Sequence, residues 1–365
     1  MTSLSEMIRW RSGVVVSLGR SWPGAVELTA SVDGDGEVPA LAYDQVVGRP
    51  EVGDRVLLNT SALALGLGTG GYAMVVALPD RLPRDPQPGP GHLVKSRYTP
   101  LQTTVLGVDE QESPFHQTLR EADDLAGMPV VVADLHSALP AIIAGIRSGR
   151  PDARVAYVMT DGGALPLWYS RSVAALRAAD WLTCVVTVGQ AYGGDAEAVS
   201  LHTGLLAARH VYHADVAVVV QGPGNLGSGT RWGFSGIACG EAVNATAVLG
   251  GRCVASLRIS QADRRDRHYG VSHHSLTAYG RVALMPADVV VPRLTGEIAD
   301  RVAGQLACFA RHRIVTVPVD GLLDSLRSAP VALSTMGRSL DEDAAYFLSA
   351  AAAGRHAAAL LDRPN

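Results

Sequence analysis

The chain has 365 residues, of which 47% are hydrophobic and 18% charged, the composition of a globular protein with enough apolar residues for a sizeable core. Its net charge of −4 offers no basic surface for nucleic acid. No stretch approaches the roughly 18 consecutive apolar residues of a membrane span. The four cysteines are widely spaced, which predicts reduced thiols. With no signal-peptide pattern at the N-terminus, we expect a cytoplasmic protein.

Residues 1–80 predict a small β-barrel domain. Five β-branched or alternating runs are separated by Gly, Pro and Asp, at 12–18, 25–32, 38–43, 54–59 and 72–78. Because no helical pattern interrupts them, the segment is typical of an OB-like or similar barrel. A proline-rich stretch follows, and residues 81–92 predict a linker.

Residues 93–365 predict a Rossmann-like α/β domain. Apolar β-rich runs alternate there with Ala- and Leu-rich helical stretches. The predicted strands are 128–135, 153–160, 181–188, 214–221, 252–259, 287–292 and 312–319. Runs that are apolar on both faces are typical of a sheet covered on both sides. The fold class is therefore α/β, with a doubly wound, mainly parallel sheet and helices on both faces.

In such a sheet, ligands bind outside the carboxyl ends of the strands. The segments just after the predicted strands are polar, glycine-rich or histidine-bearing. This coincidence is the strongest indication of function in the sequence.

A glycine-rich loop, "QGPGNLGSGTRWGFSG" at 221–236, follows one buried run. We expect a helix to start near Gly233, whose N-terminus would favour an anion. The loop lacks the lysine of a P-loop and the G-x-G-x-x-G fingerprint. Anion binding and a tight strand–helix turn both remain open. The candidate anion-binding residues here are Gly224, Gly227, Ser228, Gly229 and Thr230.

A second cluster, "DRRDRHYGVSHH" at 263–274, combines acidic, basic and imidazole side chains. Arg267 could bind an anion, while His268, His273 and His274 suit acid–base chemistry or a divalent metal. Adjacent His273 and His274 should point apart, so we expect at most one of them to bind a given metal. A solvated charged loop without function is the alternative.

Further candidates follow other strands: His136, Asp161 and Asp195. Asp161 joins the catalytic set, and His136 and Asp195 join His273 as candidate metal ligands. Asp161 and Asp195 also qualify as helix caps, which is the structural alternative for these two residues. Because all parallel strand ends lie on one edge, we expect these residues and the three later histidines to converge in one cavity.

Six segments together carry a resemblance to a known family: "KSRYTPLQ", "MTDGGALP", "GGDAEAV", "GPGNLGSGT", "DRRDRHYGVSHH" and "STMGR". The chain resembles a bacterial protein family known only as a domain of unknown function. The resemblance covers most of the chain, the barrel included. It implies no activity, cofactor or catalytic residue.

The leading hypothesis is a hydrolase or group transferase acting on a small phosphorylated or otherwise anionic metabolite. A divalent metal is one candidate cofactor. A non-catalytic binding protein or sensor for the same kind of ligand is the second hypothesis, and an assembly protein without a ligand is the third. We expect a homo-oligomer, and neither nucleic acid nor membrane as a partner.

Overall fold

A computed structural model describes residues 7–67, 70–87 and 89–362. Residues 1–6, 68–69, 88 and 363–365, which the predicted domains and linker include, lie outside the described residues. The chain divides into two compact units, Met1–Gly89 with Tyr98–Gln102 and Pro90–Arg97 with Thr103–Asn365. Within the described ranges, no helix has the length and hydropathy needed to cross a bilayer.

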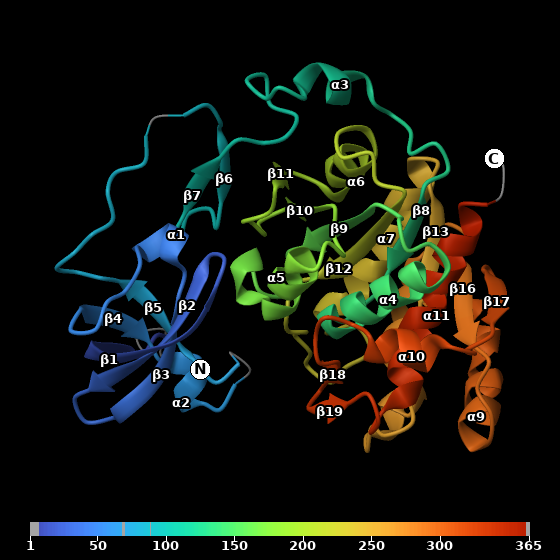
Figure 1. Cartoon of the computed structure of the whole chain (residues 1–365). Helices are drawn as coiled ribbons and strands as arrows, with labels where there is room; N and C mark the ends of the chain where they lie inside the picture. The colour runs from blue at the N-terminus through green and yellow to red at the C-terminus, as the bar shows by residue number, and fades with distance from the viewer. Residues whose placement is uncertain (1–6, 68–69, 88, 363–365) are drawn as a thin grey trace. The chain divides into compact units, whose positions relative to one another are not determined.

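The first unit is built on a closed barrel with the strand order β1-β2-β3-β5-β4 (Figure 1). The barrel closes through β1 and β4, and its one parallel pair joins β3 and β5. Alternation along β2 directs Leu28, Ala30 and Val32 into the barrel core. The predicted OB-like barrel is thereby confirmed. Its elements are β1 (Trp10–Trp22), β2 (Ala25–Val32), β3 (Gly36–Ala42), α1 (Asp44–Val47), β4 (Arg55–Asn59), α2 (Ser61–Ala64) and β5 (Ala73–Ala77).

The second unit is built on an eight-stranded sheet in which every neighbouring pair is parallel. The two middle strands, Val216–Gln221 and Pro129–Val132, are buried along their whole length, as expected for a sheet covered on both faces. In spatial order the strands are β11 (Ala196–Ala198), β10 (Cys184–Val188), β9 (Val155–Thr160), β12 (Val216–Gln221), β8 (Pro129–Val132), β13 (Arg252–Ser256), β16 (Asp288–Pro292) and β17 (Arg313–Val317).

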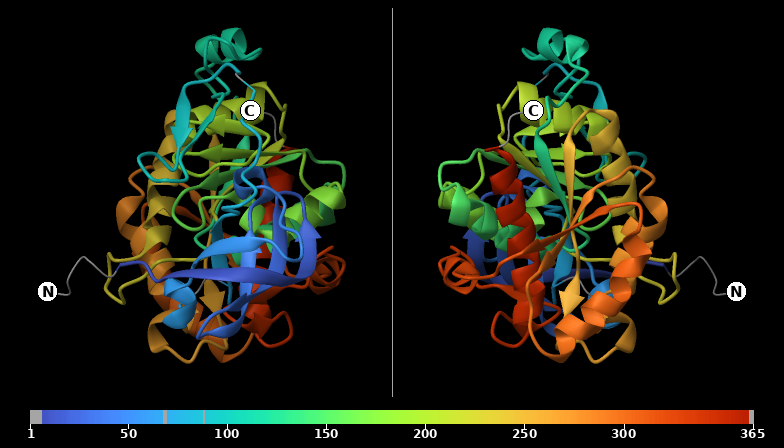
Figure 2. Two further views of the ribbon diagram at one scale, coloured as in Figure 1. Left: turned by 90° about the vertical axis from the view of Figure 1, so that its left-hand side faces the viewer. Right: turned by 90° about the vertical axis from the view of Figure 1, so that its right-hand side faces the viewer.

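Helices cover both faces of this sheet, so the predicted fold class is confirmed (Figure 2). One core contains apolar side chains of α4 (Leu139–Gly149), α5 (Arg171–Ala178), α10 (Leu322–Arg327) and α11 (Ala344–Leu360). The other contains those of α3 (His116–Glu121), α6 (Leu201–His210), α7 (Ala238–Val248) and α9 (Glu297–Gln305). The short helix α8 comprises His273–Thr277.

Three two-stranded pairs complete the second unit. They are β6 (Leu93–Lys95) with β7 (Thr103–Val105), β14 (Ile259–Ser260) with β15 (Gly270–Val271), and β18 (Ser334–Thr335) with β19 (Arg338–Ser339). Sequence periodicity does not predict these pairs because each strand has only two or three residues. In the described part of 78–92 the chain forms neither helix nor strand.

Two local predictions are wrong. Asp195 does not cap a helix, because residues 196–198 form the edge strand β11 and Ser200 caps α6 through the amide of Thr203. The helix after the glycine-rich loop starts not near Gly233 but at Ala238, after a 3₁₀ turn at Ser235–Ile237.

Helices α4 and α11 pack at very close range through two glycines. A Cβ added at Gly145 would lie 1.9 Å from the carbonyl oxygen of Ala351, and one at Gly354 would lie 1.9 Å from that of Ile142. The two backbones can therefore approach only where both side chains are absent.

We predict that Gly145→Ala destabilises the fold although alanine favours a helix by about 1 kcal/mol. The added methyl group must push α11 away from α4, which costs about 1–3 kcal/mol as overpacking. Gly149→Ala on the same helix is the matched control, because its Cβ would meet Ala358 at an ordinary 3.7 Å. In urea unfolding, the free energy of unfolding should be lower for Gly145→Ala than for wild type, and equal or higher for Gly149→Ala. Equal stability of the two variants would contradict the contact.

The carboxylate of Asp288, at the start of β16, predicts part of the loss of fold stability at acid pH. Burial raises the pKa of Asp288, but hydrogen bonds with His356 and Arg313 outweigh burial and lower that pKa to about 2. The unfolded chain has an Asp pKa of about 3.9, so this group stabilises the fold above that pH. The stabilisation is lost as the pH falls from about 4 towards 2. Asp288→Asn should lower the melting temperature at pH 7 and flatten its decline over this window. An unchanged decline would contradict the assignment.

Candidate functional site

A crevice is expected where the chain leaves two adjacent strands in opposite directions. β8 and β13 are such neighbours. The chain leaves β8 through α4 towards β9 on one side, and leaves β13 towards β16 on the other. The residues just beyond the carboxyl ends of these two strands therefore define the candidate site.

The segment after β13 forms a hairpin that returns to the same strand end. β14 pairs with β15, and the amide of Ser272 donates to the carbonyl of Arg258 at 2.8 Å. The hairpin holds a 3₁₀ turn at Asp266–His268, and α8 follows directly. In this way residues 258 and 268–274 meet at one place.

Three histidines form a compact cluster there. Ring centroids are 4.9 Å apart for His268 and His273, 5.0 Å for His268 and His274, and 4.4 Å for His273 and His274. One nitrogen from each ring lies within 4.8 Å of the other two. His268 and His274 are buried, whereas His273 is half-buried. The expectation that His273 and His274 point apart is wrong, because both rings turn towards His268 at the first turn of α8.

The imidazoles are held in place by neighbouring groups. His268 Nδ1 lies 2.7 Å from Ser272 Oγ, and His274 stacks on Phe234 with ring centroids 3.9 Å apart. Burial and nearby arginine charges lower the pKa of His268 to about 3, and burial with the neighbouring His274 lowers that of His273 to about 4. These two rings are neutral at pH 7, so each keeps a nitrogen lone pair.

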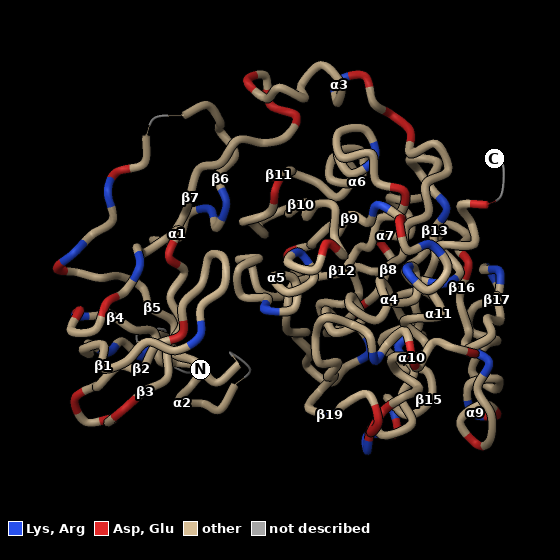
Figure 3. The backbone as a smooth tube through the Cα atoms, viewed as in Figure 1, with Lys and Arg blue, Asp and Glu red and all other residues tan. Residues whose placement is uncertain are grey.

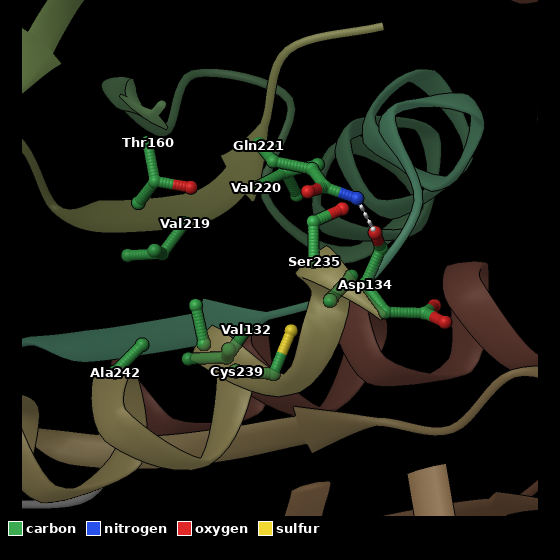
Figure 4. A pocket seen from close by; sticks show the side chains of 12 residues that line it. Val132, Asp134, Thr160, Val219, Val220, Gln221, Ser235, Cys239 and Ala242 are labelled. Atoms are coloured by element: carbon green, nitrogen blue, oxygen red, sulfur yellow. Dashed lines mark hydrogen bonds between the residues drawn. The ribbon is translucent and has the colours of Figure 1, made fainter. Parts of the chain in front are cut away.

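Asp134, at the end of β8, lies behind His274. Its Oδ2 is 3.5 Å from His274 Nδ1 and 4.0 Å from the Arg258 guanidinium, and it has no hydrogen-bond partner. Burial alone would raise the pKa of Asp134, but His274 and Arg258 outweigh it and lower that pKa. In Figure 4 the carboxylate points away from Gln221, whose amide donates to the Asp134 carbonyl at 2.8 Å. The cavity beside it measures about 10 Å³, enough for about one water molecule but not for a substrate.

Further charges surround the cluster in balanced pairs. Asp263 lies 3.7 Å from Arg258 and 2.7 Å from Arg265. Arg338 pairs with Asp343 at 3.0 Å, and Asp343 accepts from the Ser260 hydroxyl at 2.6 Å. Near β15 and β19, acidic and basic positions lie close together (Figure 3). The network connects the hairpin after β13 with the chain before α11.

The glycine-rich loop does contact the histidine cluster, but through residues other than those predicted. Phe234 stacks on His274, and Asn225 Nδ2 lies 3.5 Å from His274 Nδ1. Gly224, Gly227 and Gly229 are exposed. The Ser228 amide and hydroxyl contact the carbonyl of Gly233, and Thr230 Oγ1 accepts from the Gly233 amide. The loop is thus partly closed on itself by its own hydroxyl groups.

Three predicted residues lie apart from the histidine cluster. His136 contacts Ser170 at 2.7 Å and the Tyr157 hydroxyl at 3.2 Å, on the α4 side of the sheet. The Asp161 carboxylate accepts a hydrogen bond from the backbone amide of Gln190 at 3.0 Å. Asp195 binds Arg177 and the amide of Val185, at the amino end of β10. The expectation that all six residues share one cavity is wrong.

The width of the sheet explains the separation of Asp161, whereas His136 follows β8, next to β13, and is held on the α4 side by Ser170 and Tyr157. Strands are about 4.8 Å apart, so β9 lies about 14 Å from β13, three spacings away along the edge. Residues on one edge therefore need not share a site. Asp195 is further excluded because it precedes a strand instead of following one.

Sequence reasoning missed Asp134 and Arg258. Asp134 lay inside the predicted strand 128–135, whereas β8 ends at Val132. Arg258 lay inside a run interpreted as continuous strand, whereas β13 ends at Ser256.

Comparison with known proteins confirms the family resemblance. A family model described as "Protein of unknown function (DUF3866)" matches residues 39–354. The chain belongs to this family. No curated protein matches the chain. The DUF3866 match includes every residue of the cluster, from Asp134 to Asp343, so this site lies within the part of the chain that defines the family.

A second buried polar group at the same edge has a structural explanation. Lys95 is fully buried, and its ammonium donates to the carbonyls of Gly189, Ala191 and Ala198 at 2.8–3.1 Å. It also lies 3.3 Å from Glu197 Oε2. Burial lowers the pKa of Lys95 and raises that of Glu197, and each charge opposes the shift of the other. Because three carbonyls and a carboxylate surround its ammonium, Lys95 stabilises the packing of β6 against the edge formed by β10 and β11.

We predict that Lys95→Met destabilises the fold by about 3–5 kcal/mol, because it leaves the Glu197 carboxylate buried without its counter-charge. Lys95→Met combined with Glu197→Gln should recover part of this loss. Chemical unfolding of the two single variants and the double variant measures the coupling free energy. Additive losses would show that the two groups do not interact.

Proposed function

We propose that the chain is a hydrolase or group transferase that acts on a small anionic substrate beside His268, His273 and His274. The observation that carries the proposal is the meeting of these imidazoles with Asp134 beyond the carboxyl ends of β8 and β13. Ligands of open α/β sheets bind beyond such strand ends.

The charge around the half-buried histidine favours an anion. The positive charges of Arg267, Arg258 and Arg265 all lower the pKa of His273, so each acts on the space around that ring. Arg267 is exposed, unlike the buried Arg258. A phosphate or carboxylate group approaching His273 would therefore meet an arginine that can bind it in bidentate fashion.

Hydrolysis here would add the oxygen of water to a phosphorus or acyl carbon and break the bond to the leaving oxygen. The net proton transfer runs from water to that leaving oxygen, so the protein is unchanged at the end. A transferase would use an acceptor hydroxyl in place of water. Asp161, which is held by Gln190, has no role in this proposal.

The cellular setting is part of the proposal. All four cysteines are free thiols, and three of them are buried. Free thiols favour a reducing compartment such as the cytoplasm. A homo-oligomer remains a prediction.

Arg267→Gln tests the anion-binding part. The variant should raise KM for an anionic substrate about fivefold, the value of one exposed ion pair of about 1 kcal/mol, with kcat nearly unchanged. The assay is turnover of a phosphomonoester, a phosphodiester and a carboxylic ester by the full chain. Arg120→Gln on α3 is the matched control and should have no effect.

A calorimetric titration with inorganic phosphate, combined with the turnover assay, separates the enzyme from the non-catalytic binding protein. Turnover together with phosphate inhibition supports the enzyme. Phosphate binding without turnover favours the non-catalytic binding protein instead. A folded chain that neither binds phosphate nor turns over any of the three substrates contradicts the proposal.

A further inference from the structure

We infer that His268, His273 and His274 together bind one divalent transition metal ion of the zinc class. The inference uses the site proposed above but does not depend on its activity. It assigns the three imidazoles as ligands and Asp134 as a positioning residue.

The donor atoms already lie near ligand geometry. One nitrogen of each ring is within 4.8 Å of the other two. A tetrahedral zinc ion with bonds of about 2.0–2.1 Å places its nitrogen ligands about 3.3 Å apart. The rings must therefore close by at most about 1.5 Å, and His273, as the least buried ring, has the most freedom to move. Three protein ligands leave a fourth position for water or substrate, the arrangement of catalytic rather than structural zinc sites.

The outer contacts of two rings match those of metal-bound histidines. Such a histidine commonly donates its second ring N–H to a carboxylate or another oxygen, which fixes the ring and exposes the first nitrogen. His268 Nδ1 faces Ser272 Oγ at 2.7 Å, and that oxygen also accepts from the amide of His274. His274 Nδ1 faces Asp134 Oδ2 at 3.5 Å. Both contacts leave Nε2 for the metal.

Asp134 decides the tautomer of His274. Asn225 Nδ2 and the Arg258 guanidinium also lie 3.5 Å from His274 Nδ1, and both are donors. Asp134 Oδ2, however, is a buried carboxylate oxygen without another hydrogen-bond partner. Leaving such an atom unpaired costs more than leaving either donor with a weak contact. A proton on Nδ1, pointing at Asp134, is therefore the favoured arrangement.

The surrounding charges leave room for a cation. Arg258, Arg265 and Arg338 are offset by Asp134, Asp263 and Asp343. Arg267, which also acts on His273, adds a positive charge beyond these three pairs, and a bound divalent ion would add to it. This charge would attract the anionic substrate.

The test uses the full chain, stripped with a chelator and then titrated with Zn²⁺ alone or Co²⁺ alone. We expect one equivalent of either ion per chain, with the visible absorption of tetrahedral cobalt. His273→Ala should weaken binding more than about 100-fold, because losing a ligand exceeds the roughly 10–100-fold cost of losing an outer contact. Asp134→Asn should weaken it about 10-fold or more.

Controls separate this site from others. His202→Ala, on the exposed side of α6, and Cys308→Ser, which removes the exposed thiol, should leave binding unchanged. Circular dichroism melts establish that each variant is folded. A folded wild type without a one-equivalent site, or unchanged binding in both His273→Ala and Asp134→Asn, overturns the inference. Metal binding without turnover contradicts only the proposed function.

Discussion

The parallel sheet of the second unit depends on one constraint: both of its faces must be covered by helices, so each strand connects to the next through a crossover. At β8 and β13 these crossovers leave in opposite directions, and the gap between the two strand ends is occupied by the hairpin that follows β13. Tyr279 fixes the floor of that gap, since its hydroxyl donates to the carbonyl of Val132 at 2.8 Å and lies 3.3 Å from that of Ser256. The position of the site thus follows from topology before any side chain is considered.

The hairpin after β13 converts this gap into a chemically defined site. The pairing of β14 with β15 brings Arg258 beside Ser272, whose hydroxyl oxygen contacts His268 Nδ1 and accepts from the amide of His274. Gly270, at the first position of β15, has a φ of +75°, which a side chain would strain. Its absent Cβ would also lie 2.5 Å from the Gln305 side chain, which binds both the amide and the carbonyl of Val271. The hairpin is therefore anchored to α9 at the point where the chain turns towards the histidines.

Sequence patterns predicted the parts of this molecule that depend on local periodicity. The five barrel strands and seven of the sheet strands coincide with predicted runs of six or more residues, although β8 retains only four residues and the edge strand β17 is mostly exposed. The edge strand β11 has three residues and includes Glu197, a poor strand former whose burial depends on Lys95 about 100 positions away. Such pairings leave no periodic trace. The same reason hid Asp134 and Arg258, because only the three-dimensional path of the hairpin brings them to the histidines.

Two buried polar groups at the carboxyl edge differ in how completely their atoms are paired, and this difference separates scaffold from site. The Lys95 ammonium has three carbonyls and a carboxylate around it, so nothing further needs to bind there. At the other group, Asp134 Oδ2 lacks a hydrogen bond, and one nitrogen of each neighbouring imidazole lies within 4.8 Å of the other two. Fold stability alone does not account for polar atoms left unpaired in a buried position, since they cost free energy. An outside partner that binds the imidazole nitrogens, and draws His274 into a firm contact with Asp134, gives these atoms a physical reason to be there.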